Sequence, residues 1–352
     1  GQSNMEYPVY RALNPDRAIA DSDNSQVRLL TIPHVADIRT QDKLPAGTKW
    51  DVAGPDTVRD FSAVCYFAGL ALQQENDAPV GLIDSSWGGS QIEAWLSSDD
   101  LRAVGGFTEQ LSQIELYARD PRAAMTSYGK HWEAWWRSVD RDQAPWTSDA
   151  TGPGWKAAPD IMDDWKIYGD PEAETHLGRV WYGKTFSLSA KQARLGGSLS
   201  LGLFDDTDAT WINGHFLGST SSWTDARTYQ VPAAFLKPGK NTIIVKVLNT
   251  YGKGGMLGPN DAVALKFQSG ESLPLGTDWT YRVVSDSKPG GPQPPWDTVT
   301  GYTTIHNAMI APLTGFPLHA VIWYQGESNA DRGLAYQPLL ERLVKSWRTY
   351  FG

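Results

Sequence analysis

The sequence predicts an α/β domain with a parallel sheet, interrupted by an inserted all-β sandwich. Two short, continuously apolar runs, at residues 79–83 and 320–323, are typical of buried parallel strands. A loop rich in Gly, Ser, Gln and Asn follows each run, where ligands bind in such sheets. Between the two runs, residues 141–285 consist of short alternating segments separated by turn residues, which is typical of a β-sandwich.

The composition is that of a globular protein long enough for two domains. The chain has 352 residues, of which 41% are hydrophobic and 20% are charged. The net charge is −9 and there is no run of Lys or Arg, which argues against binding to nucleic acid. No apolar run reaches the ~20 residues of a membrane span. The single cysteine, Cys65, allows no internal disulfide, and the 16 Trp and 14 Tyr can serve either as core or as platforms for sugar rings.

In the first part of the chain, the pattern predicts strand, helix and strand in that order. Residues 27–32 alternate as a strand does. Asp56 and Thr57 are expected to cap a helix whose apolar positions run from Val58 to Leu72. Residues 91–140, after the strand at 79–83, are expected to be mostly helical. Trp132, Trp135 and Trp136 share one face of that region, which we expect to pack against another domain.

In the second part, two turns and a return to α/β character are predicted. Asn213-Gly214 joins two apolar runs and indicates a hairpin, and residues 236–241 form a second turn before a strand. Residues 287–295 are rich in Pro and Gly, which is typical of a stiff linker. A short helical segment at 306–313, the strand at 320–323 and an amphipathic helix from Tyr336 to about Tyr350 are expected to follow.

Three stretches carry residues suited to acyl transfer. Ser3 lies in Gly-Gln-Ser-Asn-Met, where the flanking amides could surround an exposed hydroxyl, although such residues also form ordinary turns. Residues 85–90 offer the backbone N–H groups of Gly88 and Gly89 as oxyanion donors, or form a plain tight turn. Residues 323–329 offer the amides of Gln325 and Asn329, with Glu327 as an acid. No strand precedes the serine, so we expect the sequence to begin inside a longer protein.

Part of the β-rich region resembles galactose-binding-like jelly-roll domains. The residues that carry this resemblance are 205–215, which read DDTDATWINGH, and 236–242, which read LKPGKNT. In that family the domain either binds sugar or is only structural, and both possibilities stay open here.

The three motif stretches together resemble the sialate O-acetylesterase family of SGNH-type hydrolases. The resemblance implies a flavodoxin-like, three-layer parallel sheet made from residues 1–140 and 286–352, with residues 141–285 inserted as a jelly roll. It implies that Ser3 is the nucleophile and that Gly88 or Gly89, with Gln325 or Asn329, forms the oxyanion hole. It also implies no cofactor and no metal, an acetylated sugar or polysaccharide as substrate, and a periplasmic or extracellular location.

The sequence departs from this family in its general base. The family places a histidine in an Asp-x-x-His motif near the C-terminus, and no such motif follows Asn329. We therefore expect that the catalytic histidine lies outside this chain and that the chain is truncated at both ends. His306 and His34 are the candidates within it, since the other four histidines occupy the β insert, the Trp-rich helix or a predicted strand. Glu327 is expected either to orient a histidine or to bond backbone N–H groups of its own loop.

These observations predict a carbohydrate O-acetylesterase that uses a serine acyl-enzyme. The resemblance names sialate O-acetyl esters, such as 9-O-acetyl sialic acid, as substrates, and acetylated xylan or another polysaccharide is the alternative. The alternative of another class is a non-catalytic carbohydrate-binding protein. The abundance of Trp and the missing histidine favour that alternative, whereas the three intact motifs oppose it.

Overall fold

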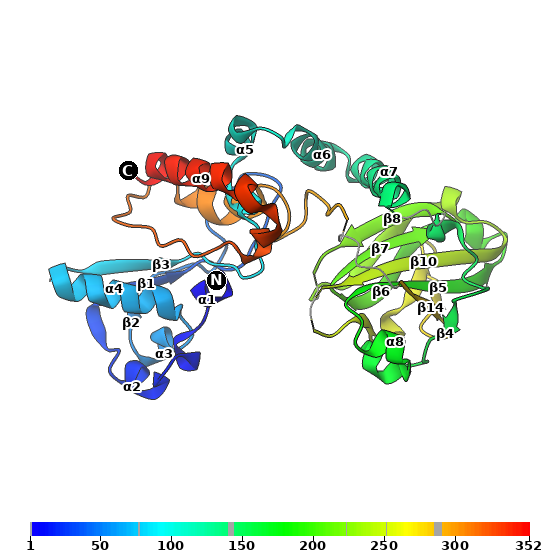
Figure 1. The fold of residues 1–352 in the computed structure, drawn as a ribbon, viewed down its shortest axis with the longest axis horizontal. Helices are drawn as coiled ribbons and strands as arrows, with labels where there is room; N and C mark the ends of the chain where they lie inside the picture. Colours follow the sequence, from blue (N-terminus) through cyan, green and yellow to red (C-terminus); the bar gives the residue numbers. More distant parts are fainter. Residues whose placement is uncertain (1, 77, 140–143, 223, 251, 285–290) are drawn as a thin grey trace. The chain divides into compact units, whose positions relative to one another are not determined.

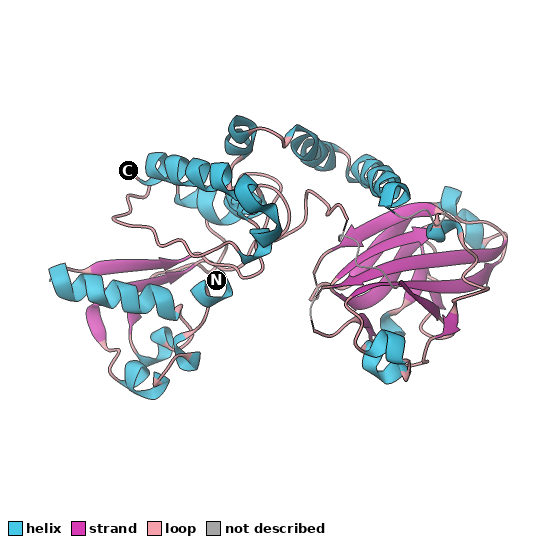
Figure 2. Ribbon diagram, in the orientation of Figure 1, coloured by secondary structure: helices cyan, strands magenta, loops and turns pink. Residues whose placement is uncertain are grey.

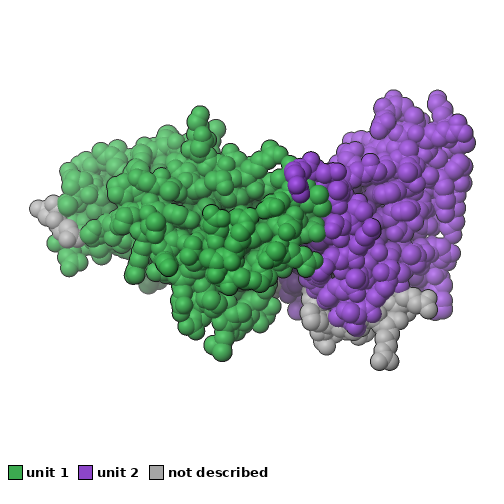
Figure 3. Space-filling model, turned by 90° about the horizontal axis from the view of Figure 1, so that it is seen from above, with its two compact units in different colours: residues 1–118, 295–352 green, residues 119–294 purple. Residues whose placement is uncertain are grey.

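The computed structural model describes residues 2–76, 78–139, 144–222, 224–250, 252–284 and 291–352 (Figure 1). Gly1 and residues 287–290 of the predicted linker at 287–295 lie outside these ranges. The chain divides into two compact units, residues 1–118 with 295–352 and residues 119–294 (Figure 3). The functional domain boundaries expected at residues 140 and 285 stay predictions.

The first unit is built on a small mixed sheet. Its strands are β1 (Asn24–Thr31), β2 (Asp51–Ala53) and β3 (Val80–Asp84), in the order β2-β1-β3. β1 and β3 run parallel, from Val27 beside Val80 to Thr31 beside Asp84, whereas β2 pairs antiparallel with β1. The sequence thus predicts β1 and β3 correctly to within three residues at each end.

Helices cover both faces of this sheet. Val27 and Leu29 of β1 pack into one apolar cluster with Tyr66 of α4 (Ala63–Asn76). Leu30 packs into a second cluster with Trp347 of α9 (Tyr336–Phe351) (Figure 1). Successive residues of a strand point to opposite faces, so the burial of both Leu29 and Leu30 shows that β1 is covered on both sides.

The other helices of this unit are short. They are α1 (Gln2–Met5), η1 (Val9–Arg11), α2 (Pro15–Ala20), α3 (Pro55–Val58), η2 (Ile92–Trp95), α5 (Ser98–Val104), η8 (His306–Ile310), η9 (Ala311–Leu313) and η10 (Glu327–Ala335). Helix α6 (Thr108–Arg119) spans the boundary between the units. In the described ranges, no helix is both long and apolar enough to cross a membrane.

The predicted flavodoxin-like parallel sheet is wrong. Within the described residues β1 and β3 are the one parallel pair, and the larger sheets of the molecule are antiparallel. The apolar run 320–323 is not a strand, and Val321 and Ile322 are each 46% exposed. Trp323 explains the difference, because its ring packs edge-on against Trp347 of α9 at 5.4 Å. The run is therefore held by side-chain packing on a helix and not by a strand ladder.

The second unit is a β-sandwich of two antiparallel sheets (Figure 2). The six-stranded sheet has the order β4-β14-β5-β10-β7-β8, and the five-stranded sheet consists of β11-β6-β12-β13 with β9 beside β6. The strands are β4 (Lys156–Ala157), β5 (Gly178–Leu188), β6 (Gly197–Asp205), β7 (Thr207–Ile212), β8 (His215–Thr220), β9 (Arg227–Val231), β10 (Gly239–Asn249), β11 (Gly255–Gly258), β12 (Ala264–Phe267), β13 (Ser272–Pro274) and β14 (Thr280–Val284). The short helices are η3 (Pro145–Thr147), η4 (Trp165–Tyr168), α8 (Pro171–Glu174), η5 (Gln192–Arg194), η6 (Ala233–Phe235) and η7 (Asn260–Ala262).

The predicted hairpin between β7 and β8 is confirmed. Ile212 pairs with His215, and the two residues between them, Asn213 and Gly214, have φ angles of 50° and 80°. Two successive positive φ angles define the type I′ turn, whose twist matches that of paired strands. Turn chemistry of this kind is local, which is why the sequence reveals it.

A tryptophan-rich layer covers the outer face of the six-stranded sheet. Helix α7 (Pro121–Val139) contributes Trp132 and Trp136, whose rings are stacked at 5.5 Å. Trp132 contacts Trp211 of β7 at 5.2 Å, and Trp136 contacts Trp181 of β5 at 5.2 Å. All four rings are at most 1% exposed, so they serve as core between helix and sheet.

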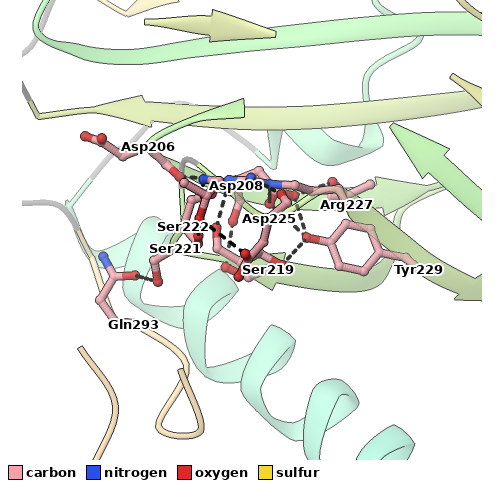
Figure 4. A network of polar contacts seen from close by, with 12 residues as sticks. Asp206, Asp208, Ser219, Ser221, Ser222, Asp225, Arg227, Tyr229 and Gln293 are labelled. Atoms are coloured by element: carbon pink, nitrogen blue, oxygen red, sulfur yellow. Dashed lines mark hydrogen bonds and ion pairs between the residues drawn. The ribbon is translucent and has the colours of Figure 1, made fainter. Parts of the chain in front are cut away.

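A charged network is buried inside the sandwich (Figure 4). The Asp208 carboxylate accepts hydrogen bonds from Arg227 Nε at 3.0 Å and from the Tyr229 hydroxyl at 2.8 Å. Both members of the ion pair are 0% exposed. The Arg227 guanidinium also donates to backbone carbonyls, including that of Asp206 at 2.8 Å. A buried ion pair whose remaining hydrogen-bonding groups are satisfied is tolerated in a core.

Candidate active site

Ser3 is an exposed residue of α1, the first helix of the described chain. The helix is held at both ends by partners far along the chain. The Gln2 backbone N–H donates to Glu327 Oε2 at 3.0 Å. At the other end, the Ser62 hydroxyl donates to the Met5 carbonyl at 2.5 Å. The position of the serine is therefore set by hydrogen bonds with the third motif, residues 323–329, and with Ser62 at the start of α4.

The buried amide of Gln2 connects all three motifs. In the orientation that satisfies both ends of the amide, its oxygen accepts from Gly89 N–H at 2.9 Å and from Ser90 N–H at 3.1 Å. Its nitrogen donates to the Ser90 carbonyl at 3.1 Å, and the Ser328 hydroxyl lies 2.5 Å from the amide. Segments separated by more than 80 residues thus meet around one side chain.

Gly88 lies directly beside the serine. A Cβ atom placed on Gly88 would lie 3.0 Å from Ser3 Oγ and 2.6 Å from Glu6 Oε1. Only a glycine permits this approach without a shift of its neighbours. The Gly88 N–H donates to Glu6 Oε2 at 2.8 Å. An anionic oxygen is therefore accommodated at the backbone N–H that the sequence predicts as an oxyanion donor.

Glu6 is a site residue that the sequence analysis missed. It follows Ser3 by three residues, and that spacing is the signal that could have revealed it. His34 Nε2 lies 3.5 Å from Glu6 Oε2 and 2.9 Å from the Ser86 carbonyl. A carbonyl only accepts, so Nε2 carries the proton in that hydrogen bond. The imidazole stacks on Trp87 at 4.5 Å, and the structure thus brings His34 into the site.

The two predicted side-chain amides of the third motif, those of Gln325 and Asn329, both form hydrogen bonds within the protein. Gln325 Nε2 donates to the Ser90 carbonyl at 2.9 Å and to Asn329 Oδ1 at 2.8 Å. Asn329 Nδ2 donates to Glu93 Oε2 at 2.8 Å, and Asn329 Oδ1 also accepts from Ile92 N–H at 2.9 Å. Asn329 is 2% exposed and Glu93 is 1% exposed. Asn329 therefore ties the second motif to the third, with Glu93, which the sequence analysis missed, as its buried partner.

Glu327 bonds the backbone at the start of the chain. The Gln2 N–H lowers the pKa of the Glu327 carboxyl to about 2. A carboxylate that accepts a backbone N–H is stabilised in its charged form. The role of Glu327 as an acid partner of a histidine stays a prediction.

A second carboxyl lies at the carboxyl end of β3. Burial raises the pKa of Asp84 to about 6, and the nearby charge of Glu6 acts in the same direction. The Ser86 hydroxyl donates to Asp84 Oδ1 at 2.6 Å. The Ser85 hydroxyl is buried and has no hydrogen-bond partner in the described part of the chain. The carboxyl end of β3 thus carries two half-buried polar residues, and the charges of Glu6 and His34 act on one of them, Asp84.

His306, the other predicted candidate for the base, is placed elsewhere. It lies in η8, is 6% exposed and contacts the Tyr350 ring at 5.8 Å. Burial lowers the pKa of its imidazole. Among the described residues, neither ring nitrogen of His306 has a hydrogen-bond partner. The same part of the chain holds no group of three or more His, Cys, Asp or Glu that could bind a metal ion.

The arrangement presents an exposed hydroxyl, a backbone N–H that binds an anionic oxygen, and an imidazole–carboxylate pair. These are the groups that nucleophilic attack on an ester requires. Every predicted oxyanion donor already has an acceptor within the protein, so a substrate oxygen would have to displace one of them. Glu6 is the acceptor at Gly88, the donor that lies beside Ser3.

Comparison with known proteins relates part of the chain to esterases. No family model matches the sequence. The chain is 36% identical over 112 residues to "Sialate O-acetylesterase" from Pongo abelii and from Homo sapiens, and 32% identical over 114 residues to the Mus musculus protein. These matches cover 30% of this chain and 21% of each relative. The chain therefore spans about a fifth of the length of the curated relatives it matches.

Solved structures show a weaker likeness. A β-glucuronidase from Ruminococcus gnavus, in complex with a C6-substituted uronic isofagomine, has 16% identity and a TM-score of 0.28, covering 42% of this chain and 27% of that one. A β-glycosidase from Bacteroides vulgatus has 27% identity and a TM-score of 0.27, covering 34% and 18%. These TM-scores carry no argument about fold or function. The sequence relatives support a relationship to sialate O-acetylesterases over part of the chain.

Proposed function

We propose that this protein is a carbohydrate O-acetylesterase that uses Ser3 as its nucleophile. The observation that carries the proposal is the meeting of three distant motifs around α1, which puts Ser3 Oγ beside Gly88. Partial similarity to proteins named sialate O-acetylesterase supports the same reaction class. We propose O-acetylated sialic acid as the substrate, acetylated xylan or another polysaccharide as the alternative, and a periplasmic or extracellular location.

In the proposed reaction, Ser3 Oγ attacks the acetyl carbonyl carbon as a base removes the hydroxyl proton. The carbonyl oxygen becomes an oxyanion, which takes the place of Glu6 at Gly88 N–H. The tetrahedral intermediate collapses, the sugar oxygen leaves with a proton, and the acetyl group stays on Ser3. Water then attacks the acyl-enzyme, releasing acetate and restoring the serine.

The first experiment is hydrolysis of 4-nitrophenyl acetate by the wild type and by Ser3→Ala. We expect Ser3→Ala to abolish turnover while far-UV circular dichroism stays unchanged. Ser25→Ala, an exposed serine of β1, is the matched control and should keep the wild-type rate. Turnover by Ser3→Ala at the wild-type rate would remove Ser3 as the nucleophile.

His34 is our first assignment for the base, because it contacts Glu6 in the site. His34→Ala should lower kcat, whereas His306→Ala should lower stability and leave kcat per folded molecule unchanged. The competing proposal, a histidine outside residues 1–352, predicts that His34→Ala has no effect on the rate. Release of acetate from 9-O-acetyl sialic acid and from acetylated xylan, measured side by side, decides between the two substrates.

One observation favours a second function, that of a non-catalytic carbohydrate-binding protein. Gly88, Gly89, Gln325 and Asn329 all donate to acceptors within the protein, which leaves no predicted oxyanion donor free in this arrangement. Binding to a glycan array without ester hydrolysis by the wild type would support this function over the esterase.

A further inference from the structure

A buried carboxylate, Glu93, lies next to the second and third motifs. Glu93 is 1% exposed and belongs to η2, which follows the loop of residues 85–90. Arg332 Nη1 lies 3.9 Å from Glu93 Oε1, but the Arg332 side chain is 39% exposed. A buried carboxylate is costly unless it is hydrogen-bonded. Because the proposed reaction does not use Glu93, its hydrogen bonds indicate what it contributes.

Glu93 determines which way the side-chain amide of Asn329 points. Glu93 Oε2 accepts from Asn329 Nδ2 at 2.8 Å. A carboxylate accepts and does not donate, so Asn329 presents its NH₂ group to Glu93 and its oxygen to the opposite side. On that side, Asn329 Oδ1 accepts from Ile92 N–H at 2.9 Å and from Gln325 Nε2 at 2.8 Å. Reversal of the Asn329 amide would place donors against donors there.

The amide of Asn329 in turn determines the orientation of Gln325. Because Asn329 Oδ1 accepts from Gln325 Nε2, the oxygen of Gln325 points away, and the Tyr336 hydroxyl donates to that oxygen at 2.8 Å. Gln325 Nε2 also donates to the Ser90 carbonyl at 2.9 Å. The direction of each of these hydrogen bonds is therefore consistent with the carboxylate of Glu93 at the end of the series.

Ser90 is the last residue of the loop that carries Gly88. Its carbonyl accepts from Gln325 Nε2 and also from the amide nitrogen of Gln2, at 3.1 Å. Its N–H donates to the amide oxygen of Gln2, also at 3.1 Å. These hydrogen bonds hold the peptide groups of Ser90, and Gly88, two residues earlier, lies beside Ser3. A misplacement of about 1 Å can cost about 10²-fold in rate, so the support of this loop bears on catalysis.

We propose that Glu93 is a positioning residue for the proposed esterase. Through Asn329 and Gln325 it holds residues 85–90, and thereby the Gly88 N–H, beside the nucleophile. The inference rests on the proposed function, in which that N–H binds the oxyanion. The role depends on the reach of the Glu93 side chain, because its oxygen has to meet Asn329, and it does not depend on the charge.

The test compares Glu93→Asp with Glu93→Gln. Aspartate keeps the charge but is too short to reach Asn329, whereas glutamine keeps both the reach and an accepting oxygen. We expect Glu93→Asp to lower kcat for 4-nitrophenyl acetate at least about tenfold and Glu93→Gln to stay within about threefold of the wild type. Amide hydrogen exchange of residues 85–90, measured by mass spectrometry, should be faster in Glu93→Asp alone. Equal results for the two variants, or a larger loss in Glu93→Gln, as an ion pair with Arg332 would require, overturn the proposal.

Asp100→Asn is the matched control for a loss of stability. Asp100 is also a buried carboxylate of the first unit, but it accepts from Arg342 and Ser346 of α9. This variant should unfold at a lower urea concentration and keep the wild-type kcat and the wild-type exchange of residues 85–90. A loss of kcat equal to that of Glu93→Asp would show that Glu93 is only structural.

Gln325→Met tests whether Glu93 acts through Gln325, and it also serves if Glu93→Asp does not fold. Since both changes release the same loop, the double variant should lose no more kcat than the weaker of the two single variants. Losses that multiply, or wild-type exchange of residues 85–90 in Gln325→Met, would overturn the proposal. If the wild type shows no turnover, the proposed function fails, and the exchange comparison still decides whether Glu93 holds the loop.

Discussion

Replacing Asp208 by Asn tests whether the ion pair inside the sandwich is needed for stability. The carboxylate accepts from Arg227 Nε, from the Tyr229 hydroxyl and from the Thr210 hydroxyl, at 2.8–3.0 Å. Asparagine keeps the shape but removes the charge, and its NH₂ group turns a donor toward groups that are themselves donors. The Arg227 guanidinium would stay buried without its counter-charge.

The expected loss is about 3 kcal/mol of unfolding free energy. Removing one partner of a buried ion pair typically costs about 3–5 kcal/mol. The lower end applies here because Arg227 keeps hydrogen bonds to backbone carbonyls, including those of Ser222 and Asp225. Urea unfolding followed by tryptophan fluorescence measures the loss, since the buried Trp181 and Trp211 report on this unit.

The matched control for this experiment is Asp278→Asn. Asp278 also pairs with a cation, Lys184, at 3.6 Å, but its side chain is 85% exposed. Surface pairs contribute about 0–1 kcal/mol, so this variant should unfold close to the wild type. If Asp208→Asn and Asp278→Asn shift the unfolding free energy equally, the reasoning about the buried pair is refuted.

Three further predictions concern the site and two buried ionisable groups. Gly88→Ala should lower kcat/KM for 4-nitrophenyl acetate by about 10²-fold, because the new Cβ displaces Ser3 or Glu6; an unchanged rate would contradict the assigned geometry. The pKa of Asp84 is raised from its ordinary value of 3.8 to about 6, so the folded chain binds more protons than the unfolded chain between these two pH values. Stability should therefore fall by about 3 kcal/mol from pH 4 to pH 6, and Asp84→Asn should remove that fall in urea unfolding at each pH. Burial lowers the pKa of Lys246 from 10.5 to about 7, so the unfolded chain binds more protons between these values. Stability should rise over that interval, and Lys246→Met should flatten the rise; an equal slope in the variant would contradict the assignment.

Local sequence patterns predicted correctly those elements whose structure depends on the residues of the pattern itself. The alternation in β1, the apolar run in β3 and the turn at Asn213-Gly214 appear in the structure close to their predicted places. The start of α4 was predicted too early, because Asp56 and Thr57 lie in a separate short helix, α3. Cys65 N–H bonds to Ser62 Oγ at 3.1 Å, so Ser62 begins the longer helix.

Patterns failed where packing with distant residues decides the outcome. The run 320–323 has the composition of a buried strand, but composition does not specify a pairing partner, and Trp323 joins an aromatic cluster instead. Glu6 and Glu93 carry no motif of their own, and their roles depend on contacts with Gly88 and Asn329 that form only in three dimensions. The motifs therefore indicated which segments of the chain lie together, but not which polar groups form the hydrogen bonds between them.

The hydrogen bond between Gln2 and Glu327 joins residues 325 positions apart, which has a consequence for the order of events during synthesis. At about 5–20 residues per second, a ribosome needs on the order of half a minute to make the chain between them. The whole β-sandwich is translated in that interval, and it can fold while the serine segment is still without its partner. A nascent chain stalled before residue 325 should therefore carry a folded sandwich and an unassembled first motif.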